Sequence, residues 1–164
     1  MSTFSFDIVS EIDKTEMNNV FGQAEKEIGN RYDFRGTSAK VDWLEDKKGF
    51  KLTGDNEWQI EAVLDIIRKK LASREQSSKV LDLSKEKVVA NLKTTWEVPF
   101  KAGLPQDIAK KISANIRAEV PKAKPQIQGD TIRVTSASKD ELQKVINLVK
   151  SSDYDLPLQF INYR

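Results

Sequence analysis

A short segment of the chain concentrates residues that suit phosphate binding and base stacking. The segment Arg31-Tyr32-Asp33-Phe34-Arg35-Gly36 places two arginines around two aromatic residues. A guanidinium group can grip a phosphate through two parallel hydrogen bonds, and an aromatic ring offers a plane for a base. The aromatic residues can instead anchor the segment in a core while the arginines pair with Asp33 or a neighbouring helix. The sequence leaves both interpretations open.

A second group of polar residues recurs at every other position near Gly129-Asp130. If Ile127, Ile132 and Val134 point toward helices, strand alternation sends the polar residues between them to the opposite face. A two-residue loop at Gly129-Asp130 suits a turn with positive φ at its glycine. That loop sets the register of the hairpin, so Gln128 lies opposite Thr131 and Gln126 lies opposite Arg133.

The same parity extends to the end of the chain. Leu158 and Phe160 are expected to enter the core, while Gln159, Ile161 and Tyr163 face outward. Amides and a guanidinium group can hydrogen-bond base edges and phosphates, and Tyr163 can stack on a base. Polar residues on a solvated sheet face are also ordinary, so this pattern does not by itself define a site.

The composition argues against most catalytic chemistry. The chain has no His and no Cys, so it lacks the usual proton-transfer residue and any thiolate nucleophile or Cys-rich zinc site. Glycine-rich phosphate motifs and calcium-loop spacing are also missing. Asp33 and Asp130 are candidate carboxylates for an enzyme, but neither is paired with a nucleophile or a second acid. We therefore expect no catalytic residues, no metal and no cofactor.

Charge and hydropathy favour an intracellular protein with at most a local basic surface. The net charge is +2, with 11 Lys/Arg against 8 Asp/Glu in residues 94–164 and a slight acidic excess before them. The N-terminus resembles no signal peptide, and no apolar run reaches the about 20 residues of a membrane helix. A cytoplasmic location without membrane association is expected.

The apolar pattern repeats once along the chain. Residues 50–53 and 132–135 alternate like strands 82 positions apart, and each is followed by a helical apolar stripe at the same offset, over residues 60–67 and 142–149. Each copy also has a hairpin partner strand, and a strand and helix before it. Closing strands are expected at residues 79–83 and 158–163.

The repeat predicts an α+β fold made of two ferredoxin-like βαββαβ domains in tandem. Each has a four-stranded antiparallel sheet with two helices on one face. The expected boundaries are residues 1–83 for the first domain, 84–93 for a linker and 94–164 for the second domain. Whether the first strand completes its own sheet or is exchanged into the other domain stays open.

Several segments together resemble the YajQ family of bacterial nucleotide-binding proteins. They are Ser5-Phe6-Asp7-Ile8-Val9-Ser10-Glu11, Arg31-Tyr32-Asp33-Phe34-Arg35-Gly36, Gln126-Ile127-Gln128-Gly129-Asp130 with Ile132-Arg133-Val134, Lys139-Asp140-Glu141-Leu142-Gln143, and Pro157 to Arg164. The resemblance implies ferredoxin-like domains related to RNA-binding folds and non-enzymatic binding of nucleotides or RNA. In some members it implies sensing of cyclic di-GMP linked to transcription.

These observations lead to one principal expectation and one alternative. The principal one is a nucleotide-binding protein whose ligand is cyclic di-GMP, GTP, ATP, or single-stranded RNA or tRNA. The alternative is an adaptor that captures a transcription regulator, for example by adding a strand to a sheet edge. The candidate ligand contacts are Arg31, Tyr32, Phe34, Arg35, Gln126, Gln128, Asp130, Arg133, Gln159, Tyr163 and Arg164.

Overall fold

The computed structural model describes residues 3–164 and divides the chain into two compact units. One unit, here called the split unit, combines the residues up to Glu11 with Ala102–Arg164. The other, the inserted unit, is Ile12–Lys101. Within the described residues, no helix has the length and apolar character needed to cross a membrane.

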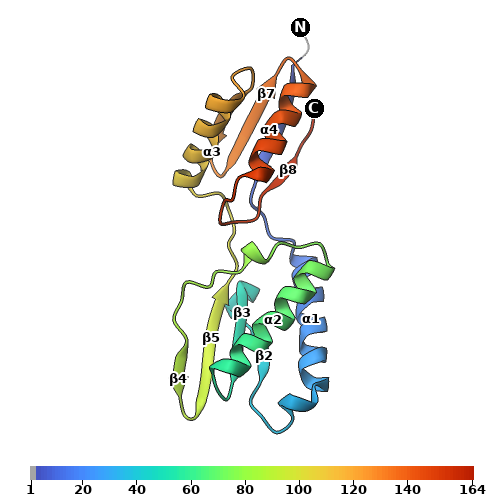
Figure 1. The fold of residues 1–164 in the computed structure, drawn as a ribbon, viewed down its shortest axis with the longest axis vertical. Coiled ribbons are helices and arrows are strands. Elements are labelled where there is room, and N and C mark those ends of the chain that lie inside the picture. The colour runs from blue at the N-terminus through green and yellow to red at the C-terminus, as the bar shows by residue number, and fades with distance from the viewer. Residues whose placement is uncertain (1–2) are drawn as a thin grey trace. The chain divides into compact units, whose positions relative to one another are not determined.

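The split unit is a ferredoxin-like βαββαβ fold that is interrupted after its first strand. Its antiparallel sheet has the strand order β6-β7-β1-β8, so the N-terminal strand lies in the interior of the sheet between two C-terminal strands. Figure 1 shows this blue strand beside the orange and red elements. The elements are β1 (Phe4–Val9), α3 (Gln106–Glu119), β6 (Lys124–Gln128), β7 (Thr131–Ser136), α4 (Lys139–Ser151) and β8 (Gln159–Ile161).

The core of the split unit lies between its sheet and its two helices. Phe6 and Ile8 of β1 and Ile132 and Val134 of β7 are fully buried there, together with the apolar stripes of α3 and α4. The strands show the period of two expected for one buried face, since β7 alternates strictly between buried and partly exposed residues.

The inserted unit has the same strand arrangement in a permuted chain order. Its antiparallel sheet runs β2-β3-β5-β4, so β5 takes the interior position that β1 takes in the split unit. The elements are α1 (Lys14–Asn30), β2 (Lys40–Trp43), β3 (Gly49–Gly54), α2 (Glu57–Ser73), β4 (Val88–Ala90) and β5 (Lys93–Pro99). Three 3-10 turns, Tyr32–Phe34, Glu45–Lys47 and Ser78–Val80, join them. The α+β fold with two ferredoxin-like sheets is confirmed.

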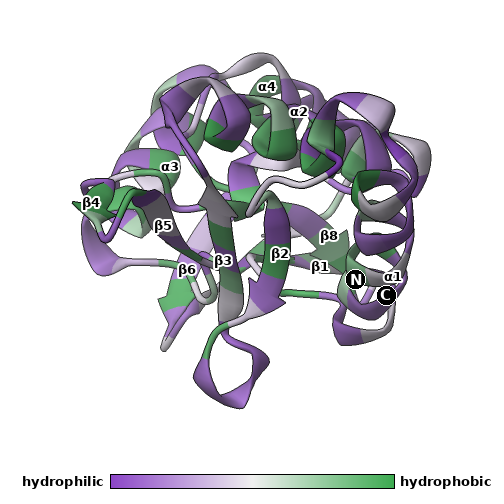
Figure 2. Ribbon diagram, turned by 90° about the horizontal axis from the view of Figure 1, so that it is seen from below, coloured by the Kyte–Doolittle hydropathy of each residue, from purple (hydrophilic) through white to green (hydrophobic). Residues whose placement is uncertain are grey.

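Helices α1 and α2 begin where side chains cap them. The Asp13 carboxylate accepts a hydrogen bond from the Glu16 amide at 3.1 Å, and the Asn56 side chain accepts one from the Gln59 amide at 2.9 Å. Green and purple segments alternate along the helical ribbons in Figure 2, as expected for helices with one apolar face. Those faces pack in a core that includes the rings of Phe50 and Trp96.

The boundaries of the compact units differ from those expected from the sequence. The unit boundaries fall after Glu11 and Lys101, not within residues 84–93. The expected linker contains β4, which pairs with β5 in the sheet of the inserted unit. The expected closing strand at residues 79–83 is a 3-10 turn followed by one isolated bridge from Leu81 to Phe100. Strand β1, for which the sequence left both sheets open, lies in the sheet of the C-terminal strands, and β5, expected in the second domain, completes the sheet of the inserted unit.

Candidate functional site

The sheet of the split unit presents a polar face on the side opposite its helices. The hairpin register is the predicted one, with Gln126 opposite Arg133 and Gln128 opposite Thr131. Gly129 has the expected positive φ of 62° in the turn. Both glutamines are exposed, and neither side chain is hydrogen-bonded to another residue within 3–164. We call this surface, with Ser5, Asp7 and Ile161 of the neighbouring strands, the polar face.

A buried carboxylate organises the centre of the polar face. Asp7 lies opposite Arg133 in the sheet and is only 5% exposed. Its Oδ1 accepts a hydrogen bond from Arg133 Nε at 3.1 Å, and its Oδ2 accepts one from Asn162 Nδ2 at 2.8 Å. The Asp7 carboxylate therefore fixes one edge of the guanidinium group, while the terminal Nη nitrogens of Arg133 donate to no residue that the structure describes.

Two arginines act on Asp7. Burial alone raises the pKa of the Asp7 carboxyl, but hydrogen bonds from Arg133 and Asn162 and the charges of Arg133 and Arg164 together lower it below its usual value. Arg164 is held at this place because its backbone N–H and C=O both bond to Ser5, at 2.9 and 3.2 Å. The guanidinium groups of Arg133 and Arg164 thus both act on the single carboxylate of Asp7.

A β-bulge next to this cluster corrects the prediction for Tyr163. Asp7 pairs with Ile161, whereas Ser5 pairs with Arg164, so the C-terminal segment contains one extra residue opposite Phe6. Asn162 accommodates it with a positive φ of 57°. The alternation shifts there, and the ring of Tyr163 stacks on the core residue Phe6 with centroids 5.9 Å apart. Tyr163 therefore lies on the helix side of the sheet and not on the polar face.

Of two further candidate residues, Gln159 is hydrogen-bonded within the protein and Asp130 is exposed. The side-chain amide of Gln159 accepts from the Glu11 backbone N–H at 2.8 Å and donates to its C=O at 3.2 Å, so it holds the end of β1. Asp130 is exposed in the hairpin turn. Only Asp130 of this pair offers its whole side chain to a ligand.

One half of the Arg31–Gly36 segment, in the inserted unit, has the structural role that the sequence allowed, and the other half is open to a ligand. Arg31 donates two hydrogen bonds to Asp33, at 3.0 and 2.6 Å, and its guanidinium group lies 4.5 Å from the centroid of the Phe34 ring. The hydrogen bonds from Arg31 lower the pKa of the Asp33 carboxyl. Phe34 is only 5% exposed, so its ring serves the core and offers no surface for stacking.

The other half of this segment is open. Tyr32 is 82% exposed, and the guanidinium group of Arg35 lies 5.5 Å from the centroid of its ring. The side chain of Arg35 has no hydrogen bond or ion pair within residues 3–164. The loop that follows is fixed, since Gly36 adopts a φ of 74° and Ser38 donates two hydrogen bonds to Asp55. Tyr32 and Arg35 therefore form an exposed pair on an ordered loop, here called the Tyr32/Arg35 pair.

The structure assigns the candidate residues to two separate surfaces. Gln126, Gln128, Arg133 and Arg164 gather on the polar face of the split unit, and the Tyr32/Arg35 pair belongs to the inserted unit. Sequence reasoning missed Asp7 and Asn162 as members of the polar face. The position of Asp7 between the core residues Phe6 and Ile8 was the available signal, because alternation places it on the face of Arg133.

The described residues contain no cluster of three or more acidic side chains that could hold a metal ion. Asp33, one of the carboxylates considered for catalysis, is engaged by Arg31. The fold and the two surfaces thus define an α+β protein of two ferredoxin-like units with exposed cationic and aromatic groups suited to ligand binding.

Comparison with known proteins places the chain in a family. A family model described as nucleotide-binding protein YajQ-like matches residues 4–164. Proteins from Nocardioides sp. and Nocardia farcinica are each 44% identical over 165 residues, covering the whole of both chains. One from Trichormus variabilis is 41% identical over 163 residues and 99% of each chain. All three are named nucleotide-binding protein. The chain belongs to the YajQ-like nucleotide-binding protein family, which confirms the resemblance seen in the sequence.

Proposed function

We propose that this protein binds a nucleotide or single-stranded RNA on the polar face of the split unit, without catalysis. The observation that carries the proposal is the arginine held by a buried carboxylate: Asp7 orients Arg133, whose Nη nitrogens point to no protein partner, and Arg164 adds a second positive charge. Because the guanidinium group is already oriented, less side-chain entropy is lost when a phosphate binds.

The neighbouring amides support recognition of a base. Gln126 and Gln128 lie beside Arg133 and Thr131 and can donate to and accept from base edges. Arginine pairs well with the O6 and N7 acceptors of guanine, which favours a guanine nucleotide such as cyclic di-GMP or a guanine-containing RNA. The names of the relatives agree with a nucleotide ligand.

The Tyr32/Arg35 pair supplies a second contact surface in this proposal. An exposed ring can stack on a base for about 1–3 kcal/mol, and the adjacent guanidinium group can pair with its phosphate. Asp130 is a further exposed contact at the hairpin turn. The absence of His and Cys from the sequence supports a binding role over a catalytic one and is compatible with action in the cytoplasm.

Equilibrium binding of cyclic di-GMP, GTP and a short single-stranded RNA at two salt concentrations tests this proposal. We expect Arg133→Gln to weaken binding about tenfold, because a charge-assisted phosphate contact is lost. Arg35→Ala should weaken RNA more than a single nucleotide. Arg68→Ala is the matched control, since Arg68 is an exposed arginine on α2 that pairs with Asp65.

If Arg133→Gln and Arg35→Ala both bind with unchanged affinity, neither the polar face nor the Tyr32/Arg35 pair belongs to the ligand site. RNA binding that falls steeply with salt would indicate contacts with the phosphate backbone, and dinucleotide binding with little salt dependence would indicate a shaped site.

A protein-interaction adaptor is the second candidate function. The edge strand β4 exposes Val88 and Val89, and Leu92 at its hairpin tip is also exposed; β4 is green in Figure 2. An exposed apolar edge can accept a strand from a partner such as a transcription regulator. Recovery of a stoichiometric protein partner on nuclease-treated bait, lost when Val89 is replaced by Lys, would favour this function over nucleotide binding.

A further inference from the structure

A groove of about 430 Å³ lies on the helix side of the split unit, and Ser5 and Arg164 at the margin of the polar face also line it. Its walls come from the start of β1, the first half of α4 and the end of the chain. Most of its lining is apolar or aromatic, and basic and amide groups interrupt it. The lining residues are Phe4, Ser5, Lys139, Leu142, Gln143, Ile146, Tyr163 and Arg164.

The β-bulge at Asn162 builds one wall of this groove. Because the extra residue shifts the alternation, Tyr163 turns to the helix side and stacks on Phe6. Tyr163 as a residue remains 63% exposed, although one side of its ring contacts Phe6. A large aromatic ring that is anchored on one side and open on the other is a stacking surface with a fixed orientation.

Lys139, one of the two basic residues of the groove, lies over the ring of Phe4. Lys139 Nζ lies 5.0 Å from the centroid of the Phe4 ring. Lys139 is also the first residue of α4, whose N-cap Ser138 makes no side-chain capping bond. The positive end of the helix therefore adds to the charge of Lys139. The acidic residues of that turn, Asp140 and Glu141, are not among the groove residues, and Glu141 is paired with Lys144 at 3.1 Å.

One amide completes the set of polar groups. Gln143 lies one helical turn after Lys139, and its Nε2 donates to Asn147 at 3.0 Å. That bond orients the amide and leaves its Oε1 as an acceptor for a ligand N–H group. The volume lies within the about 300–1,000 Å³ usual for small-molecule sites, which are mostly apolar with a few placed polar groups.

We propose that this groove binds a nucleoside monophosphate, with the base on the ring of Tyr163, a base N–H donating to Gln143 and the phosphate paired with Lys139. The combination of an open ring, a hydrogen-bond acceptor and a cation matches a planar base that carries an anionic group. The inference goes beyond the polar-face proposal and stands if that proposal fails, because Phe4, Lys139, Gln143 and Tyr163 all lie off the polar face.

Titration of the ¹⁵N-labelled full chain with 5′-GMP, guanosine or inorganic phosphate tests the groove. With 5′-GMP, we expect saturable shifts of the Lys139, Gln143 and Tyr163 amide signals. Guanosine and phosphate alone should bind more weakly than 5′-GMP, because each engages only one part of the groove. Lys139→Ala should weaken 5′-GMP binding several-fold, and Tyr163→Ala about tenfold.

Two variants serve as matched controls. Lys150 is also a lysine of α4 placed over an aromatic ring, at 5.8 Å from Phe160, but it is not a groove residue. Lys150→Ala should therefore leave 5′-GMP affinity unchanged. Tyr163→Phe keeps the ring and should keep most of the affinity.

Any one of three results would contradict the proposal that the groove binds a nucleoside monophosphate. They are shifts that occur only on the polar face, equal effects of Lys139→Ala and Lys150→Ala, and phosphate binding as strong as 5′-GMP binding. Arg133→Gln separates the two proposals, because it should weaken binding on the polar face about tenfold and leave the affinity measured from the groove signals unchanged.

Discussion

At the scale of single residues, Asp7 is the group whose surroundings depart most from those of an ordinary surface carboxylate. It is buried and accepts hydrogen bonds from Arg133 and Asn162. We predict that Asp7→Asn lowers the free energy of unfolding by about 1–3 kcal/mol at neutral pH, since bonds to a charged group are lost and Arg133 loses its counter-charge.

The same residue predicts a pH dependence with a definite sign. Although burial raises the pKa of Asp7, the bonds and charges from its partners lower it in the folded protein, below 3.8. The ionised carboxylate therefore contributes stability above the unfolded pKa, and this contribution is lost as the pH falls through the folded pKa. The difference in the free energy of unfolding between wild type and Asp7→Asn should become smaller below about pH 4.

Chemical denaturation at pH 7 and pH 3.5 measures that difference. Asp130→Asn is the control, since its carboxylate is exposed in a turn and should give little difference at either pH. If wild type and Asp7→Asn differ in the free energy of unfolding by the same amount at both pH values, the charge of Asp7 does not stabilise the fold through its pair with Arg133.

Residue placement could be predicted from the sequence wherever strand alternation is unbroken. The pairing of Gln126 with Arg133 followed directly from a two-residue loop and a period of two. The prediction for Tyr163 was wrong because Asn162 adopts a positive φ, which asparagine tolerates better than most residues. One such residue reverses the side of everything after it, and the sequence alone carries no strong signal for it.

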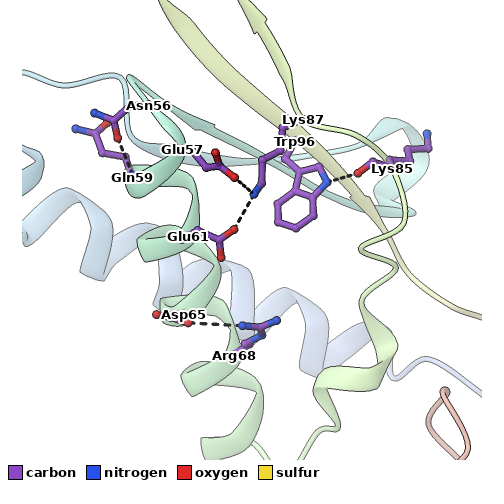
Figure 3. A network of polar contacts seen from close by, with 9 residues as sticks. All are labelled: Asn56, Glu57, Gln59, Glu61, Asp65, Arg68, Lys85, Lys87 and Trp96. Atoms are coloured by element: carbon purple, nitrogen blue, oxygen red, sulfur yellow. Dashed lines mark hydrogen bonds and ion pairs between the residues drawn. The ribbon is translucent and has the colours of Figure 1, made fainter.

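At the scale of elements, the segment before β4 is fastened to α2 by one lysine. Lys87 Nζ contacts Glu57 at 2.8 Å and Glu61 at 2.7 Å, and it lies 4.6 Å from the centroid of the Trp96 ring (Figure 3). The indole N–H of Trp96 donates to the Lys85 carbonyl at 2.7 Å. The segment expected to be a linker is thus packed against the helix.

We predict that Lys87→Ala loosens this segment while the fold is retained. Proteolysis within residues 84–88 should become faster, and the fluorescence of Trp96, now buried, should shift to longer wavelength. Lys85→Ala is the matched control, because the contact of Lys85 with Trp96 uses its backbone carbonyl. If both variants behave like wild type, packing of β4 alone holds the segment.

Helices and hairpins were predictable because their periodicity is local, whereas the closing strand at residues 79–83 was not. Val80 and Leu81 are buried as a strand would bury them, but they belong to a 3-10 turn and an isolated bridge. A short apolar run is consistent with several local structures. In the sheet of the inserted unit, the position beside β3 is occupied by β5, not by residues 79–83.

At the scale of the whole molecule, the chain passes between the two units twice. The choice of sheet for β1 could not be made from the sequence, because the apolar faces of β1 and β5 fit either sheet equally well by pattern. The inserted unit contains all four strands and both helices of its own core within residues 12–101. The split unit needs β1 between β7 and β8.

We therefore predict that fragments of the two units differ in their ability to fold alone. Residues 12–101 alone should fold cooperatively with Trp96 buried, whereas residues 102–164 alone should not, because the sheet then lacks an interior strand. Joining residues 1–11 to 102–164 through a short Gly-Ser linker should restore folding, since Ser10 and Gly103 already share a backbone hydrogen bond of 2.8 Å. Circular dichroism and amide dispersion in NMR spectra measure this. Equal folding of both fragments would contradict the assigned topology.

The interior position of β1 also determines the order of events during synthesis on the ribosome. Asp7 is made first among its partners, yet Arg133 follows 126 positions later. Until then the strand carries Phe4, Phe6 and Ile8 with no sheet to receive them, while residues 12–101 can complete their own core. During translation, β1 therefore stays without its partner strands until β7 and β8 have been made.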